Sequence, residues 1–177
     1  ASWPPVSALV IISARHQPPA TAPWLGGRGG VIGRLPPVTD DKAPELAVSQ
    51  WFNTDNGFTL AGLRGHVVVI EAFQMLCPGC VSHGLLQAQR IHQTFGADLT
   101  VLGLHTVFEH HAAMTPVSLA AFLHEYRITF PVGVDTPEAG IETPITMRRY
   151  HLQGTPSLIV IDRDGRLRIN AFGHIDD

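Results

Sequence analysis

The sequence predicts an α/β fold in which helices pack against a sheet. Runs rich in β-branched residues alternate along the chain with segments whose apolar residues recur every three or four positions. The last two runs are joined by Asp164-Gly165, a dipeptide that favours a hairpin. Hydrophobic residues make up 45% of the 177 residues and charged residues 15%, which is typical of a packed domain and too apolar for a disordered chain.

The first elements lead to the two cysteines. Residues 58–60 indicate a short strand, and residues 63–66 a turn into the next run, Val67–Phe73. That run is β-branched without alternation, as is typical of a strand buried on both faces. After the cysteines, apolar residues at helical spacing predict an amphipathic helix that ends at Gly96. Its apolar positions are Val81, Leu85, Ala88, Ile91 and Phe95.

The alternation continues through the rest of the chain. A second β-type run at 99–105 is followed by an irregular, His-rich stretch and by a helix around residues 119–126. The remaining expected elements are a strand at 130–134, a short helix at 145–150, and strands at 157–161 and 167–172. Three parallel-type strands followed by a hairpin therefore predict an α/β sandwich.

Residues 1–42 predict an N-terminal extension. They contain half of the chain's 14 prolines and a group of glycines, without sustained helical or alternating periodicity. We expect a linker, an arm that docks on the domain, or residues of an upstream reading frame. Residues 43–177 are expected to form the folded domain.

Charge and hydropathy disfavour several classes of partner. The formal charge of −3 offers no basic field for nucleic acid or an anionic membrane surface. No apolar stretch approaches the roughly 20 residues that a membrane-spanning helix requires, and no export signal is visible. We therefore expect no nucleic acid, no membrane span and a cytoplasmic location, or a periplasmic one if an export signal has been removed.

Both cysteines lie in the segment Cys77-Pro78-Gly79-Cys80, where a strand passes into a helix. Unpaired backbone N–H groups and the positive end of the helix favour a thiolate at Cys77. Pro78 suits a first helical turn, because its missing N–H would have no partner there. The spacing lets Cys80 face Cys77. We therefore expect Cys77 to attack a disulfide and Cys80 to resolve the mixed disulfide.

Other roles of a C-x-x-C segment fit less well. A c-type haem site needs a histidine after the second cysteine, and this chain has Val81. A structural zinc site usually needs two ligand pairs, and only His83 could join the cysteines. Two inert buried cysteines are a third reading, although a helix start is a poor place for them. The zinc and inert readings stay open as alternatives.

The sequence holds ten histidines, of which His105, His110 and His111 follow the second β-type run. They raise the question of a metal site. Adjacent histidines point different ways in most conformations, so a loop of solvated histidines is the commoner outcome. We expect no metal.

Two motifs in this order resemble the thioredoxin superfamily. Val67–Phe73 leads into the C-P-G-C segment, and Gly154-Thr155-Pro156-Ser157 precedes a later strand. The sequence is most similar to the TlpA-like, redoxin branch, over about residues 43–175. The resemblance implies a thioredoxin-like three-layer α/β/α sandwich with a mixed sheet of four to five strands. It also implies a C-terminal helix, which is missing from this sequence.

The same resemblance implies the roles of the site residues. Cys77 is the attacking thiol, Cys80 is the resolving thiol, and a cis peptide bond before Pro156 faces the pair. The backbone of Thr155 is then free to pair with an extended substrate. Glu71 occupies the place of a buried acid that accepts the proton of Cys80, or else it reaches solvent from the strand end.

Substrate contacts are expected at Leu76, Pro78, Gly79, Thr155 and Pro156. Family members usually carry Trp where this chain has Leu76. We therefore expect the flat aromatic surface that helps to contact partners to be absent.

These features predict a thiol-disulfide oxidoreductase with no cofactor besides its own Cys77–Cys80 disulfide. Its partners would be a protein or low-molecular-weight thiol or disulfide and a recycling reductant or oxidant. A peroxiredoxin-type thiol peroxidase is one alternative, although that activity needs Thr or Ser where this chain has Gln74. A redox-responsive binding module, weakly favoured by Leu76, is another.

Overall fold

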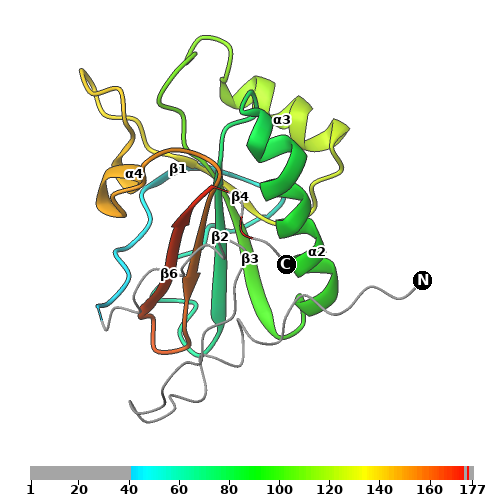
Figure 1. Cartoon of the computed structure of the whole chain (residues 1–177), viewed down its shortest axis with the longest axis vertical. Helices are drawn as coiled ribbons and strands as arrows, with labels where there is room; N and C mark the ends of the chain where they lie inside the picture. The colour runs from blue at the N-terminus through cyan, green and yellow to red at the C-terminus, as the bar shows by residue number, and fades with distance from the viewer. Residues whose placement is uncertain (1–40, 174, 176–177) are drawn as a thin grey trace, which may run out of the picture.

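A six-stranded mixed sheet forms the centre of the computed structural model, which describes residues 41–173 and 175 (Figure 1). The strand order is β1-β4-β3-β2-β5-β6. Strands β2, β3 and β4 are parallel, whereas β1, β5 and β6 pair antiparallel with β4, β2 and β5. The strands are β1 (Val48–Phe52), β2 (Val67–Phe73), β3 (Leu99–His105), β4 (Val132–Asp135), β5 (Ser157–Ile161) and β6 (Leu167–Phe172).

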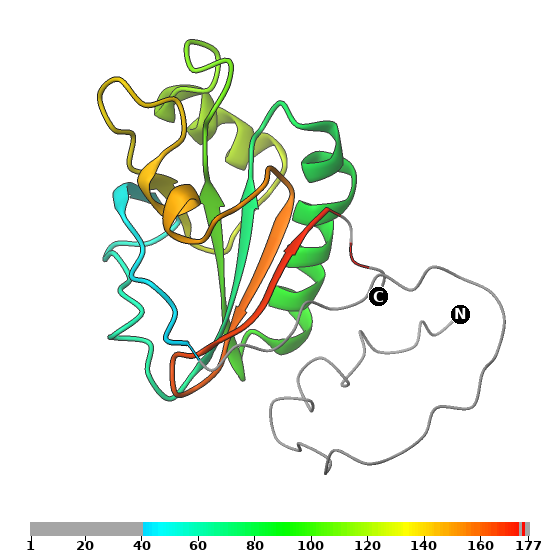
Figure 2. The same cartoon turned by 60° about the vertical axis from the view of Figure 1, so that its left-hand side comes forward.

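Helices cover both faces of the sheet, as Figure 2 shows. The helical elements are η1 (Cys80–Gly84), α2 (Leu85–Phe95), α3 (Pro116–Glu125) and α4 (Ile145–Arg149). Apolar residues of α2 and α3 share a core cluster with Val69 and Phe73 of β2. Tyr150, at the end of α4, shares the opposite cluster with Ile70 and Ala72. The predicted three-layer α/β/α sandwich is confirmed.

Strand β2 positions the cysteines. All seven of its residues are buried, and it pairs with β3 on one side and β5 on the other. Its β-branched side chains fill both core clusters, which explains why the run shows no alternation. Cys77 therefore follows a strand that is buried along its whole length.

The sheet has six strands rather than the four to five expected, and its first strand lies elsewhere than predicted. Residues 58–60 do not form a strand, whereas Val48–Phe52 pairs with β4 as an edge strand. The carboxylate of Glu45 accepts hydrogen bonds from the N–H groups of Leu60 (2.7 Å) and Ala61 (3.3 Å). The Glu45 side chain thus pairs with the N–H of Leu60, which was expected to belong to a strand.

The helix after the cysteines begins with a π-helical turn. The N–H of Leu85 donates to the carbonyl of Cys80, five residues earlier. Such turns are uncommon and are found frequently at functional sites. The predicted helix is present, but its first part is wound more widely than the apolar spacing indicates.

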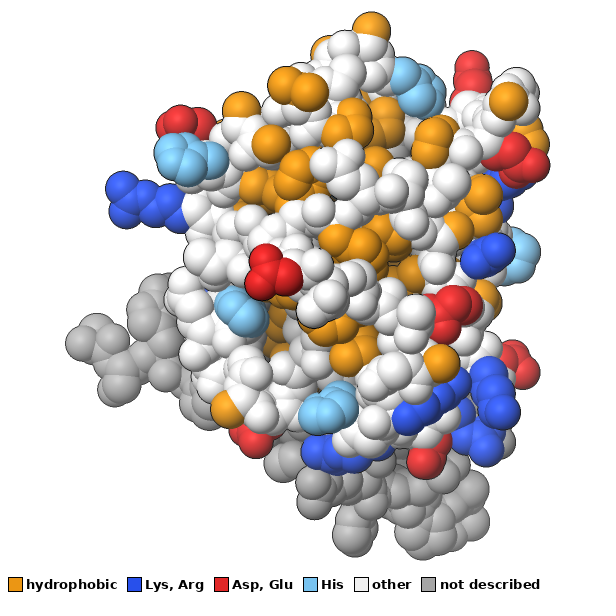
Figure 3. Space-filling model, turned by 180° about the vertical axis from the view of Figure 1, so that it is seen from behind, with side chains coloured by type: hydrophobic (Ala, Val, Ile, Leu, Met, Phe, Trp, Pro, Cys, Tyr) orange, Lys and Arg blue, Asp and Glu red, His pale blue; other side chains and the backbone are white. Residues whose placement is uncertain are grey.

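Residues 1–40 of the expected extension and residues 176–177, where a C-terminal helix would begin, lie outside the described residues. Within the described part of the chain, no helix combines the length and apolarity that a membrane span needs. Seen from behind, the molecule shows hydrophobic side chains in the middle of the surface, with most Lys and Arg toward its margins (Figure 3).

Candidate active site

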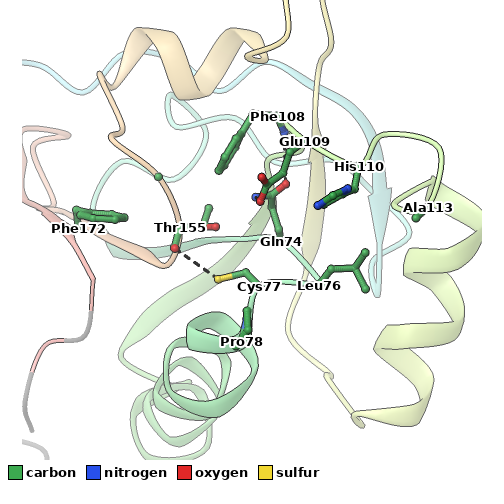
Figure 4. A pocket seen from close by; sticks show the side chains of 11 residues that line it. Gln74, Leu76, Cys77, Pro78, Phe108, Glu109, His110, Ala113, Thr155 and Phe172 are labelled. Carbon is green, nitrogen blue, oxygen red and sulfur yellow. Dashed lines mark hydrogen bonds between the residues drawn. The ribbon is translucent and has the colours of Figure 1, made fainter.

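Cys77 lies in the first turn after β2 and opens to a cavity. Its N–H donates to the carbonyl of Gln74 (3.1 Å), which closes the turn between the strand and η1. Its Sγ accepts a hydrogen bond from the N–H of Cys80 (3.3 Å) and lies 3.4 Å from the carbonyl oxygen of Thr155, to which the thiol donates (Figure 4). This sulfur is accessible and is held between the helix start and the loop before β5.

Cys80 is the inner member of the pair. It is fully buried, and both cysteines are free thiols in this structure. Burial, and then the hydrogen bond with Cys77, raise the pKa of the Cys80 thiol to about 12. Cys80 therefore holds its proton unless another group accepts it.

Glu71 lies beneath the pair on the face of β2 that η1 and α2 cover. Its side chain is 1% exposed, and Oε1 has no hydrogen-bond partner among the described residues. Burial, and then the charge of Cys77, raise the pKa of this carboxyl well above its ordinary value. The side chain is buried and does not reach solvent from the strand end.

Gly84 makes room for this carboxyl. A Cβ at Gly84 would lie 2.0 Å from Oε1 of Glu71 and 2.9 Å from Cβ of Pro156. Gly84 belongs to η1 and is buried on the same side of the helix as Cys80. The absence of a side chain at this one position lets an acid and a proline approach the helix that carries the cysteines.

The loop before β5 closes the other side of the site. The Thr155–Pro156 peptide bond is cis, and the carbonyl of Pro156 accepts a hydrogen bond from the N–H of Gly173 (2.8 Å). A Cβ at Gly79 would lie 3.3 Å from Cδ of Pro156, so the proline ring packs directly on the cysteine turn. The loop and the C-P-G-C segment, 75 or more residues apart in sequence, are in contact.

The cavity beside Cys77 has a volume of about 450 Å³. Four of the predicted site residues line it: Leu76, Cys77, Pro78 and Thr155. Gly79 and Pro156 lie directly behind them, and Cys80 and Glu71 lie beneath. The structure thus gathers all the predicted site residues in one place, and Figure 4 shows the four that line the cavity.

Sequence reasoning missed the rest of the cavity wall. The additional lining residues are Gln74, Phe108, Glu109, His110, Ala113, Gly154 and Phe172. Residues 108–110 follow β3, and the carboxyl ends of parallel strands meet at one edge of a sheet, so that rule could have found them. No sequence signal marks Phe172. Phe108 and Phe172 supply aromatic rings to the cavity from other elements, whereas the position before Cys77 carries Leu76 in place of a Trp.

The three histidines singled out in the sequence are separated. His105 is buried, with its ring 5.3 Å from that of Phe73, and burial lowers its pKa to about 4. His110 lines the cavity, and a ring nitrogen of His111 lies 3.3 Å from the carbonyl oxygen of Glu142. Among the described residues, no group of three or more His, Cys, Asp or Glu is arranged to hold a metal.

Comparisons with solved structures show close relatives. A thioredoxin-like superfamily protein is 60% identical with a TM-score of 0.75, over 77% of this chain and 88% of its own. A thiol-disulfide isomerase from Corynebacterium glutamicum is 52% identical with a TM-score of 0.73, over 76% of this chain and 89% of its own.

A more distant match shows the fold alone. A thioredoxin-like protein solved in its oxidized form is 22% identical with a TM-score of 0.63, over 75% of this chain and 84% of its own. A comparison with curated proteins finds no match.

The family comparison covers most of the described domain. The model of the AhpC/TSA family matches residues 39–169, which include β1 to β5 and both halves of the site. The thioredoxin-like relatives agree with the observed fold. This chain is a thioredoxin-like oxidoreductase and belongs to the AhpC/TSA family.

Proposed function

We propose that this chain exchanges thiols and disulfides through a mixed disulfide on Cys77, which Cys80 resolves. The observation that carries the proposal is the unequal placement of the two sulfurs. Cys77 opens to a cavity of about 450 Å³, whereas Cys80 is buried behind it with its N–H on the Cys77 sulfur. A substrate can reach only the first sulfur directly.

The reaction transfers two electrons. In the reducing direction the Cys77 thiolate attacks one sulfur of the substrate disulfide, so that a Cys77–substrate bond forms and one substrate thiolate leaves. The Cys80 thiolate then attacks Cys77. The Cys77–Cys80 disulfide forms, the second substrate thiolate leaves, and the substrate is reduced as the pair is oxidised. The oxidising direction is the same sequence reversed.

Glu71 is proposed to accept the proton of Cys80. Resolution requires the Cys80 thiolate, yet burial holds the pKa of this thiol at about 12. An ordinary carboxylate would be too weak a base, but burial raises the pKa of Glu71 toward that of the thiol. Its unpartnered Oε1 on the covered face of β2 makes it the acid best placed for this transfer.

Substrate contacts are proposed along the cavity rim. Leu76 and Pro78 border the cysteine on one side, and the Thr155 backbone borders it on the other. Gly79 and Pro156, in contact behind the rim, fix the separation of the two sides. We propose a protein or small thiol or disulfide as substrate, a recycling reductant or oxidant as second partner, and no cofactor beyond the cysteine pair.

Disulfide exchange is favoured over peroxide reduction by the residue three positions before Cys77. A peroxidatic site resembling peroxiredoxins needs a hydroxyl there, and this chain has Gln74. The Gln74 side chain is occupied by the loop after β3, where it accepts from the N–H of Phe108 (3.4 Å) and donates to Glu109 (3.5 Å).

Trapping tests the proposal directly. Cys80→Ser should accumulate a covalent mixed disulfide between Cys77 and a substrate such as insulin, seen as a mass increase that dithiothreitol reverses. Cys77→Ser is the matched control and should trap nothing. No adduct with Cys80→Ser would favour a binding module, whereas rapid peroxide consumption with slow insulin reduction would favour the peroxidase. The cytoplasmic location stays a prediction, testable by fractionation of the native source.

A further inference from the structure

Among the described residues that line the cavity beside Cys77, Glu109 is the one that carries a carboxylate. The described residues that line it include no Lys or Arg, and His110 is their other titratable side chain besides Cys77. In Figure 4 the Glu109 side chain lies with Gln74 and Phe108 on the wall across the cavity from Pro78. A group attached to a substrate sulfur therefore enters a space whose fixed charge is negative.

Glu109 is tied to the same turn as the attacking cysteine. Gln74 is 1% exposed, and its amide nitrogen donates to Oε1 of Glu109 at 3.5 Å. The backbone carbonyl of Gln74 accepts the N–H of Cys77 at 3.1 Å. One buried residue thus contacts the carboxylate of the exposed Glu109 with its side chain and the nucleophile with its backbone, so Gln74 links the charge to Cys77.

The cavity also has apolar surface, beside the polar side chains of Gln74, His110 and Thr155. Leu76 and Phe172 are each 56% exposed at opposite ends of the cavity, and Phe108 lies between them (Figure 4). The Phe172 ring packs against Gly154, where an added Cβ would lie 2.8 Å from Cε2 of the ring. These apolar side chains, with one anionic group beside them, suit the methylene chain and cationic head of a basic side chain.

We infer that this cavity selects disulfides that carry a positive charge near the reacting sulfur, with Glu109 as the specificity-determining residue and Gln74 as its positioning residue. The substrate class is a polypeptide cystine with Lys or Arg beside it. Disulfides that carry a carboxylate at the same place are disfavoured. The inference rests on the proposed exchange at Cys77 and adds to it the chemistry of the preferred substrate.

Coulomb's law gives the size of the effect. Partly screened unit charges a few ångströms apart inside such a cavity change a rate by roughly fivefold. A cation gains and an anion loses, so the ratio of their rates should be about twentyfold at low ionic strength. High salt should reduce it.

Three small disulfides of similar size test this: cystamine (cationic), hydroxyethyl disulfide (neutral) and dithiodipropionate (anionic). Rates of reduction are compared at one pH, about 8, which lies above the ordinary pKa of an imidazole. The wild type should reduce cystamine about twentyfold faster than dithiodipropionate. Glu109→Gln should remove most of this preference and leave only the part that comes from the net charge of the whole protein. Glu125→Gln, the same charge change at the exposed end of α3, should preserve it.

A second arm uses peptide disulfides with Lys or Glu beside the cystine. A preference for the Lys peptide that Glu109→Gln abolishes would support a polypeptide substrate, whereas selectivity confined to cystamine would overturn that part of the inference. Equal slowing of all three small disulfides by Glu109→Gln would show a merely structural role and would overturn the charge selection. If hydroxyethyl disulfide is not reduced at all by the wild type, the proposed exchange itself fails.

Discussion

Replacing Gly84 with Ala tests whether the acid and the proline are packed against the active-site helix as the structure indicates. Gly84 has helical torsion angles (φ −56°, ψ −52°), so an alanine fits its backbone without strain. In an open helix this substitution would stabilise the protein by about 1 kcal/mol. At this position the new methyl group would lie 2.0 Å from Oε1 of Glu71 and 2.9 Å from Cβ of Pro156.

The two effects oppose each other, and packing should dominate. Overpacking a well-filled interior costs about 1–3 kcal/mol. Here two neighbours have to move, and one of them is a buried carboxyl, so the packing cost should be about 3 kcal/mol. Subtracting the helix preference of about 1 kcal/mol leaves a net destabilisation of about 2 kcal/mol. Urea denaturation of the reduced protein measures this difference directly.

The same substitution should slow one step of the reaction more than the other. A displaced Glu71 is no longer positioned to accept the Cys80 proton, so release of the second substrate thiol should slow by about tenfold or more. Attack by Cys77 does not need this transfer and should change much less. Stopped-flow measurement with an excess of a chromogenic disulfide separates the two thiol-release phases.

A double-mutant cycle supplies the control. Glu71→Ala removes the side chain that the new methyl group meets, so it should cost less stability in the Gly84→Ala background than in the wild type, by about 1–3 kcal/mol. Additive effects of the two substitutions, or a Gly84→Ala protein as stable as the wild type, would refute the packing argument.

Three further substitutions give separate outcomes. Glu71→Gln should raise the free energy of unfolding at about pH 8 but not at about pH 4. Burial raises the pKa of Glu71, so its ionisation opposes folding as the pH rises. Equal effects in urea titrations at both pH values would contradict this. The wild type should lose up to about 3 kcal/mol of stability as the pH falls from 6.5 to about 4, and His105→Leu should remove this loss. Burial lowers the pKa of His105 from 6.5 to about 4, so protonation in this range favours the unfolded chain. Parallel pH profiles of stability for both proteins would exclude this role of His105. Asp135→Ala should lower the free energy of unfolding by about 3 kcal/mol. The N–H groups of Thr146 (2.8 Å) and Met147 (2.9 Å) and the hydroxyl of Thr106 (3.0 Å) would lose a buried acceptor. Thermal denaturation should show a smaller loss for Asp135→Asn, and equal losses would argue against the hydrogen bonds.

Elements whose cause is local could be predicted from the sequence. The run Val67–Phe73 is buried on both faces, and its composition reflects that environment directly. The turn at Asp164-Gly165 is equally local, since Gly165 adopts φ +72°, a conformation that glycine accepts readily. These features required no knowledge of what packs against them.

Strand β1 could not be predicted in the same way, because its partner is distant. Val48–Phe52 has only partly buried or exposed residues and pairs with β4, 80 or more residues along the chain. An exposed edge strand shows weak alternation, since its burial depends on one neighbour. Residues 58–60 show the reverse error, because their apolar pattern reflects packing of Phe58 on Trp51 (5.6 Å between ring centroids) rather than strand pairing.

The aromatic part of the site shows why one position is a poor guide to a surface. Leu76 replaces the usual Trp of the resembled family, and its identity says nothing of aromatic residues that other elements bring to the site. The topology supplies rings from two other places: Phe108 follows β3, the parallel neighbour of β2, and Phe172 ends β6, two strands away on the other side. Phe172 reaches the cavity because Gly154 leaves room for its ring and because the Gly173 N–H binds the carbonyl of Pro156. The binding surface of this site is therefore determined by which strand ends meet beside Cys77, a property of the register that no single segment of the sequence contains.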